Sequence, residues 1–266
     1  MVSALATTSS DAIARRFAAL RAAGRRALVP YVTAGHPDPV RSIELLRGLE
    51  DAGADVIEIG VPFSDPMADG PVIQASSQLA LTHGMSFPRV LELISRAQLS
   101  IPVVLFTYLN PLLAAGERAL SDAAAAGAHG ILVTDLPVGS DPELERRIGE
   151  GPLAFIRLVA PTTPTERMAL IAQHGRGFVY LISRLGVTGT REDLPPDLSA
   201  TIARLRSATT LPVCVGFGIS RPDQARAVAH LADGVVVGSA VVRAAGESID
   251  RAIALVRDMR TAIDQG

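Results

Sequence analysis

Three carboxylic acids lie within twelve residues of one another. Glu58 stands in the apolar segment DVIEIG at 55–60, and Asp65 and Asp69 follow in a proline-rich loop. Two carboxyl groups held in different environments are able to divide acid and base roles between them. These three residues are therefore the first candidates for chemistry near the end of this segment.

The alternation of a β-strand predicts where Glu58 points. In a strand, Val56, Glu58 and Gly60 share one face, and Ile57 and Ile59 share the other. If the isoleucines pack on outer helices, Glu58 faces the interior, where burial raises the pKa of a carboxyl group. The alternative is a glutamate at the strand end that faces solvent or pairs with an arginine.

The loop at 61–71, VPFSDPMADGP, contains three prolines. Proline lowers the entropy lost on ordering, so such a loop can hold an acid in a fixed place. Asp65 precedes a proline and Asp69 precedes a glycine, so each is equally well explained as a turn residue.

Glycine-rich turns near the end of the chain predict a phosphate site. They are GFGIS at 216–220 and GSA at 238–240, the second followed by a possible short helix. Glycines let backbone N–H groups approach an anion, and a helix N-terminus adds its dipole. Ordinary turns between strands and helices are the alternative.

A long polar segment at 183–196 is predicted to be a lid. Gly186 and Gly189 provide hinges, Thr188 provides a hydroxyl group, and Arg184 provides a charge with either a binding or a structural role. A disordered surface loop is the alternative.

The five histidines are scattered without metal-ligand spacing, so no metal site is expected. The one cysteine, Cys214, lies in an apolar segment and is expected to be a core residue.

Short apolar segments alternate with longer amphipathic ones along the whole chain. Strands are predicted at 27–33, 55–60, 102–108, 130–134, 154–159, 177–183, 212–216 and 234–238. Helices are predicted at 10–23, 39–52, 86–97, 116–126, 141–149, 164–174, 196–207, 221–231 and 247–263. Gly53, Gly127 and Gly175 are expected to end helices in the left-handed conformation.

Eight such units predict one (β/α)8 TIM barrel with an extra N-terminal helix, a single domain over residues 1–266 whose active groups follow the strand C-termini. The alternative, an open doubly wound sheet, lacks a GxGxxG turn after the first strand.

The composition of the chain argues against several classes of function. The 266 residues are 48% hydrophobic and 20% charged, as in globular proteins, and the formal charge of −2 offers no basic field for nucleic acid. A single cysteine excludes a disulfide framework, and no apolar run approaches the ~18 residues of a membrane span. A cytoplasmic location is expected. All 25 basic residues are arginine, which excludes a lysine Schiff base.

Several motifs occur in the order found in one enzyme family. They are VPYVTAG at 29–35, EIGVPFSDPMADGP at 58–71, DLP at 135–137, APTTP at 160–164, YLISRLGVTG at 180–189 and GFGIS at 216–220. In these motifs the chain resembles the tryptophan synthase α subunits over nearly its whole length.

The resemblance implies a lyase that cleaves indole-3-glycerol phosphate to indole and glyceraldehyde 3-phosphate. It also implies an allosteric α2β2 complex with a β subunit that carries pyridoxal phosphate, and no cofactor in this chain.

The resemblance also assigns roles to residues. Asp69 would accept the indole N–H, and Glu58 would shuttle protons. Residues implied to bind substrate are Tyr108, Tyr180, Thr188, Gly189, Phe217, Gly218, Gly238 and Ser239. Asp65, Asn110 and Pro137 would face the β subunit, with Asp65 suited to communication rather than catalysis.

Two positions depart from the family pattern. Thr134 stands where proline is expected, and Arg157 stands where an apolar residue or proline is usual. An Arg157 side chain inside the barrel would change the polarity of the pocket, whereas an outward one would not. Alternative functions are a stand-alone lyase that releases indole, a non-catalytic regulatory subunit that binds the same ligand, and another phosphosugar barrel.

Overall fold

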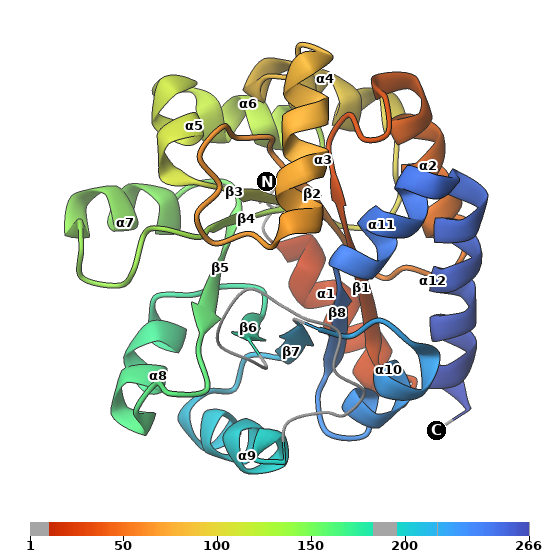
Figure 1. The fold of residues 1–266 in the computed structure, drawn as a ribbon. Helices are drawn as coiled ribbons and strands as arrows, with labels where there is room; N and C mark the ends of the chain where they lie inside the picture. The colour runs from red at the N-terminus through yellow and green to blue at the C-terminus, as the bar shows by residue number, and fades with distance from the viewer. Residues whose placement is uncertain (1–10, 183–195, 217, 266) are drawn as a thin grey trace, which may run out of the picture.

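The computed structural model describes residues 11–182, 196–216 and 218–265. Eight parallel strands close into a barrel in chain order, β8 pairing with β1 (Figure 1). The predicted (β/α)8 barrel is thus confirmed. The strands are β1 (Ala27–Thr33), β2 (Ile57–Gly60), β3 (Val103–Thr107), β4 (Gly130–Val133), β5 (Ala154–Val159), β6 (Val179–Ile182), β7 (Val213–Gly216) and β8 (Gly234–Val237).

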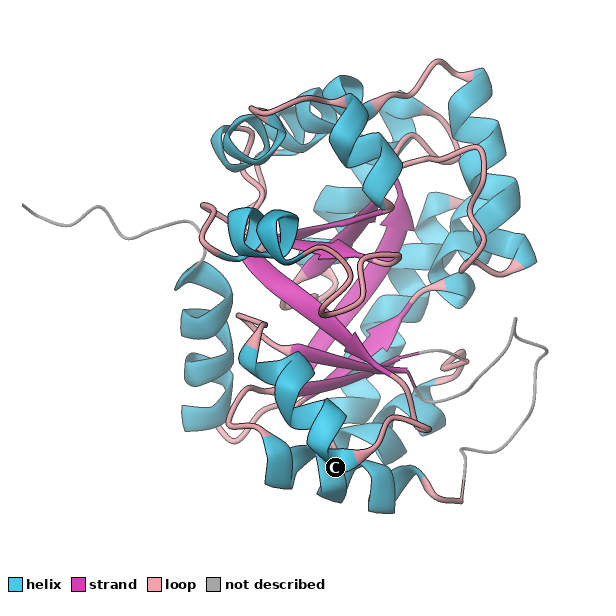
Figure 2. Cartoon of the chain, turned by 90° about the vertical axis from the view of Figure 1, so that its left-hand side faces the viewer, coloured by secondary structure: helices cyan, strands magenta, loops and turns pink. Residues whose placement is uncertain are grey.

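Helices surround the strands, as the view turned by 90° shows (Figure 2). They are α1 (Asp11–Ala22), α2 (Pro39–Asp51), α3 (Pro71–Thr82), α4 (Phe87–Ala97), α5 (Leu109–Ala114), α6 (Ala119–Ala125), α7 (Pro142–Gly149), α8 (Thr165–Gln173), α9 (Leu198–Ala208), α10 (Pro222–Ala229), α11 (Ser239–Glu247) and α12 (Ile249–Asp264). None of these helices is both long and apolar enough to span a bilayer.

The strands are apolar runs because both of their faces are buried. In and beside β2, Ile57 and Ile59 belong to the core between barrel and helices, while Val56 belongs to the core inside the barrel. The predicted alternation in this segment is confirmed.

The predicted N-terminal helix is also confirmed, and it closes the bottom of the barrel. Ile13 of α1 contacts the glycines that begin or precede β4 and β6, and Phe17 packs on Phe178 with ring centroids 5.6 Å apart. Arg16 donates to the buried Asp55 at 2.6 Å. The opposite end of the barrel, where the C-terminal ends of the strands lie, is therefore the end that is open to form an active site.

Helices α3 and α5 were not predicted. The α3 sequence PVIQASSQLALT has no charged residue and buries only Ser76, Ser77 and Ala80, so it lacks amphipathic contrast. The α5 helix has six residues, too few for a periodic pattern. The short helix expected near residue 240 is α11, with nine residues.

The prediction for the glycines is partly wrong. Gly53 and Gly127 have φ angles of +97° and +104°, as expected, but after α8 the positive φ belongs to Gly177, at +87°. Gly175 does not adopt a positive φ: its N–H donates to the carbonyl oxygen of Ala172 at 3.0 Å, and the left-handed residue of this connection comes two positions later.

Candidate active site

Glu58 lies at the mouth of the barrel on β2 and is 1% exposed. Neither carboxylate oxygen has a hydrogen-bond partner among the described residues. Burial without compensation raises the pKa of Glu58 to about 8. The predicted inward orientation and raised pKa of Glu58 are confirmed, and the alternative of a solvent-facing side chain is wrong. No arginine among the described residues pairs with it.

Asp69 lies at the end of the loop after β2, directly before Gly70, the N-cap of α3. Its backbone N–H donates to Pro66 at 3.1 Å, and its carbonyl oxygen accepts from the amide of Gln74 at 2.9 Å. Burial raises the pKa of its carboxyl to about 6, while a hydrogen bond from Tyr108 opposes the rise. The loop therefore holds a second carboxyl group that ionises more readily than Glu58.

The chain's three tyrosines all lie near these acids. Tyr180 is 5% exposed on β6, and the negative charge of Glu58 adds to the burial that raises its pKa. Tyr108 donates to Asp69, accepts from the N–H of Ala68 at 2.9 Å, and stacks on Phe63. The predicted substrate-binding tyrosines are thus placed beside the two acids.

Tyr31 was not singled out in the sequence. Its Cα pairs with that of Glu58 across β1 and β2, and burial, Asp69 and Glu58 all raise its pKa. Alternation in VPYVT at 29–33, which places Val29, Tyr31 and Thr33 on one face, was a signal that could have identified it.

The predicted phosphate site falls at the N-terminus of α11. Gly238 is its N-cap and has no side chain, so within the part of the chain that the structure describes the first-turn N–H groups, from Ser239 onward, have no N-cap side chain bound to them. Gly218, on the neighbouring loop, has a φ of +88° and open space where a Cβ would lie. Arg184, Gly186, Thr188, Gly189 and Phe217 lie outside the described residues, as does most of the predicted lid.

The residues expected to face a partner all lie on the rim of the barrel mouth. Asp65, Asn110 and Pro137 are exposed and follow β2, β3 and β4. Hydrogen bonds join their loops: Ala68 N–H donates to Tyr108, and Leu109 N–H donates to Asp135 at 2.7 Å. We call these three segments (residues 61–70, 108–114, which include α5, and 134–140) the rim surface.

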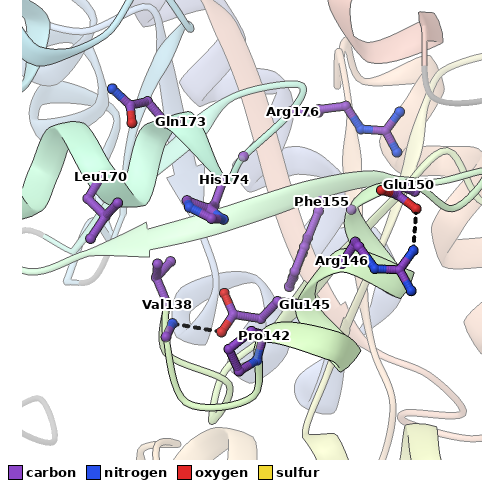
Figure 3. A pocket seen from close by; sticks show the side chains of 13 residues that line it. Val138, Pro142, Glu145, Arg146, Glu150, Phe155, Leu170, Gln173, His174 and Arg176 are labelled. Carbon is purple, nitrogen blue, oxygen red and sulfur yellow. Dashed lines mark hydrogen bonds and ion pairs between the residues drawn. The ribbon is translucent and has the colours of Figure 1, made fainter.

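Arg157 faces away from the barrel interior. Its guanidinium donates to Glu145 of α7 at 2.5 Å and lies 3.8 Å from the ring centre of Phe155. A cavity of about 490 Å³ lined by Glu145, Phe155 and the C-terminal end of α8 lies beside this pair, outside the barrel (Figure 3). The departure at position 157 therefore leaves the mouth unchanged. At the other departure, the Thr134 hydroxyl donates to the carbonyl oxygen of Thr107 at 3.3 Å.

Two further kinds of site were considered from the sequence, a reactive cysteine and a metal site. Cys214 is a fully buried free thiol on β7, which confirms the prediction of a core residue. Within the described ranges, no three His, Cys, Asp or Glu side chains cluster as metal ligands do.

Comparison with known proteins decides the family. The family model described as tryptophan synthase alpha chain matches residues 17–265. The chain belongs to the tryptophan synthase alpha chain family. The resemblance predicted from the motifs is thereby confirmed.

Individual relatives agree with this assignment. A tryptophan synthase alpha chain of Desulfatibacillum aliphaticivorans is 49% identical over 241 residues, which cover 90% of this chain and 91% of that protein. The crystal structure of tryptophan synthase subunit alpha from Legionella pneumophila has a TM-score of 0.89 at 36% identity, with 98% and 100% of the two chains covered. Tryptophan synthase of Mycobacterium tuberculosis gives 0.88 at 36% identity, with 96% and 98% covered. The chain is therefore an α-type subunit of tryptophan biosynthesis, in the family that carries out the lyase, or α, reaction.

Proposed function

We propose that the chain cleaves indole-3-glycerol phosphate to indole and glyceraldehyde 3-phosphate, with Glu58 as the proton shuttle and Asp69 as the group that stabilises charge on the indole nitrogen. The observation that carries this proposal is the difference between the two carboxyl groups, with a pKa of about 8 for Glu58 and about 6 for Asp69. At neutral pH one is an acid and the other an anion.

The chemistry requires both states. Protonated Glu58 delivers its proton to indole C3, which turns the ring into an indoleninium ion. Asp69, as the carboxylate, accepts a hydrogen bond from the ring N–H and stabilises the positive charge there. Glu58 then takes the proton from the C3′ hydroxyl group, the C3–C3′ bond breaks, and its electrons return to the ring. The products are indole and an aldehyde.

The phosphate of the substrate would bind at the N-terminus of α11, where Gly238 and Ser239 begin the helix and Gly218 lies on the neighbouring loop. By the same resemblance, Tyr108 would flank the indole and Tyr180 would line the site. By the family resemblance, Thr188, Gly189 and Phe217 complete the site.

We further propose that the rim surface binds a β subunit in an α2β2 complex. Its exposed Met67 (88%) and Leu113 (49%) supply apolar area next to Asp65, Asn110 and Pro137. A solved relative is named tryptophan synthase. Pyridoxal phosphate would belong to that partner, since this chain has no lysine to form its Schiff base.

The proposed location of the protein is the cytoplasm. The cytoplasm keeps thiols reduced, which suits the buried free thiol of Cys214.

The test is indole release from indole-3-glycerol phosphate by the purified chain, alone and with an added β subunit. We expect slow release alone, independent of pyridoxal phosphate, and a strong rise with the partner. Fast release that a β subunit does not change would favour a stand-alone lyase. No release by folded protein in either mixture would overturn the proposal in favour of a regulatory subunit.

A further inference from the structure

Residues 134–140 of the rim surface follow β4 and belong to no helix or strand. Buried backbone N–H and C=O groups in such a segment need partners outside regular structure. Leu136 and Val138 are 4% and 8% exposed, whereas Pro137 between them is exposed. The segment therefore buries two side chains and presents a proline at the surface.

Two arginines bind carbonyl oxygens of this segment. Arg157 of β5 donates through Nη1 to the carbonyl oxygen of Leu136 at 3.1 Å, and Arg167 of α8 donates to that of Val138. Hydrogen bonds from charged donors are stronger than those from neutral ones. The backbone is therefore held by a guanidinium group immediately before Pro137 and by another immediately after it.

A buried carboxyl group binds the next residue. One oxygen of Glu145 on α7 accepts the N–H of Gly139 at 2.7 Å (Figure 3). The other oxygen accepts from Arg157 at 2.5 Å, and Nε of Arg157 donates to the carbonyl oxygen of His174 at 3.2 Å. Glu145 and Arg157 are 5% and 4% exposed. Each of these buried charges thus has hydrogen bonds beyond the ion pair, which offset the cost of burying it.

The start of the segment is bound to the neighbouring part of the rim surface. The carboxylate of Asp135 accepts the N–H of Leu109, where α5 begins, at 2.7 Å. Thr134 binds the carbonyl oxygen of Thr107 through both its N–H and its hydroxyl group. Pro137 therefore lies between bound residues on both sides, although its own ring is exposed.

The three charged side chains act from outside the barrel. Arg157 faces away from the barrel interior, and α7 and α8, which carry Glu145 and Arg167, pack on β5. Their contacts reach the rim surface from the side opposite to the one that Pro137 presents. A surface segment that is already ordered loses less entropy when a partner binds it.

We propose that Arg157, Glu145 and Arg167, which we call the clamp, are positioning residues for partner binding: they hold residues 136–139 in the conformation that the β subunit binds. This inference rests on the proposed function, in which the rim surface binds a β subunit. It predicts that the clamp sets the affinity for the β subunit and not the rate of the complex once formed.

The test is the concentration of β subunit that gives half-maximal stimulation of indole release by Arg167→Met and by Arg157→Met/Glu145→Gln. The first variant removes the contact to Val138, and the second removes the contact to Leu136 without leaving an unpaired buried charge. We expect this concentration to rise about tenfold in each, since the released residues must be ordered again on binding. The rate at saturating β subunit should equal that of the parent complex.

Two controls separate positioning from general effects of losing an arginine. Arg204→Met removes an arginine that donates to another loop carbonyl oxygen, that of Pro161 at 2.9 Å, outside the rim surface. Arg146→Ala breaks the exposed pair with Glu150 on α7. Both should need the same concentration of β subunit as the parent protein. Urea unfolding reports stability, and if the double clamp variant does not fold, Arg167→Met carries the same test.

Calorimetric titration with the β subunit measures the affinity independently of turnover. If the clamp variants bind the β subunit as tightly as the parent protein, or no more weakly than Arg204→Met, the clamp does not position the rim surface. A loss of stability with an unchanged half-maximal concentration would leave the clamp only a role in the fold and would also overturn the proposal. If the parent protein itself binds no β subunit, the proposed complex fails, and the function of the clamp fails with it.

Discussion

The phenol oxygen of Tyr180 lies over Gly216, where a Cβ would come within 2.2 Å of it. Gly216 is the last residue of β7, and Tyr180 stands on the adjacent strand β6. Non-bonded carbon and oxygen atoms do not approach so closely, so a side chain at 216 must displace the ring. Because Gly216 has no side chain, the ring of Tyr180 can occupy its position in the barrel mouth.

Replacing Gly216 by alanine should lower both stability and activity. Overpacking of this kind costs about 1–3 kcal/mol in the free energy of unfolding. The displaced Tyr180 should also lower kcat/KM. The double variant Gly216→Ala/Tyr180→Leu, which removes the phenol, should recover most of the stability in urea unfolding without recovering activity.

Gly149→Ala is the matched control for that substitution. Gly149 ends α7, has an ordinary φ, and has no atom within 4 Å of a new Cβ. This change should leave stability equal or raise it by up to about 1 kcal/mol. If Gly216→Ala behaved in the same way, the close approach to Tyr180 would not constrain the site.

The pH dependence of kcat/KM should be bell-shaped. Activity should rise as Asp69 loses its proton, with an apparent pKa of about 6, and fall as Glu58 loses its own at about 8. Initial rates at low substrate concentration from pH 5 to 9 measure both limbs. A flat profile over this range would contradict the assigned protonation states.

Glu58 should also weaken the fold at neutral and alkaline pH. Its pKa rises from 4.5 to about 8 on folding, so between these values the folded state holds a proton that the unfolded state releases. The free energy of unfolding therefore loses about 1.4 kcal/mol per pH unit as the pH rises through this window. Glu58→Gln, which cannot ionise, should be the more stable protein at pH 8 and should show a smaller difference at pH 4.

Urea unfolding of Glu58→Gln and the parent protein at pH 4, 6 and 8 tests this sign. A stability difference that does not grow with pH would show that the Glu58 carboxyl group is not buried as an acid.

The barrel and the orientation of Glu58 could be predicted because both depend on local patterns. A parallel strand buried on both faces is a continuous apolar run, and one charged residue within it stands out. Helix α3 escaped prediction because its sequence has no charged residue to mark an exposed face. Alternation in VPYVT indicates the face on which Tyr31 lies, but its place beside Glu58 depends on pairing with β2 and on close approach to Gly60, which do not follow from neighbouring sequence.

Asp69→Asn should abolish indole release while leaving the fold intact. The amide has nearly the same shape as the carboxyl group but lacks the negative charge that stabilises the ring nitrogen. A loss of about 100-fold or more in kcat is expected for an electrostatic contact of this kind. Asp122→Asn, at an exposed position on α6, is the control for the same chemical change. Substantial turnover by Asp69→Asn would contradict its role at the nitrogen.

The buried pair of Arg157 and Glu145 should matter for stability and not for catalysis, since it lies between β5 and α7 outside the barrel. Arg157→Met leaves Glu145 as an unpaired buried charge, which should cost about 3–5 kcal/mol in the free energy of unfolding. In Arg157→Met/Glu145→Gln that charge is gone, and the glutamine oxygen can still accept the N–H of Gly139, so most of the loss should be recovered.

Arg146→Ala serves as the control, because it breaks an exposed i,i+4 pair with Glu150 on the same helix. It should change stability by less than about 0.5 kcal/mol. Urea unfolding measures the cost for each variant, and indole release per folded molecule should equal that of the parent protein in all of them. If Arg157→Met instead lowered kcat in fully folded protein, the outer ion pair would be coupled to the barrel mouth, and the departure at position 157 would bear on catalysis after all.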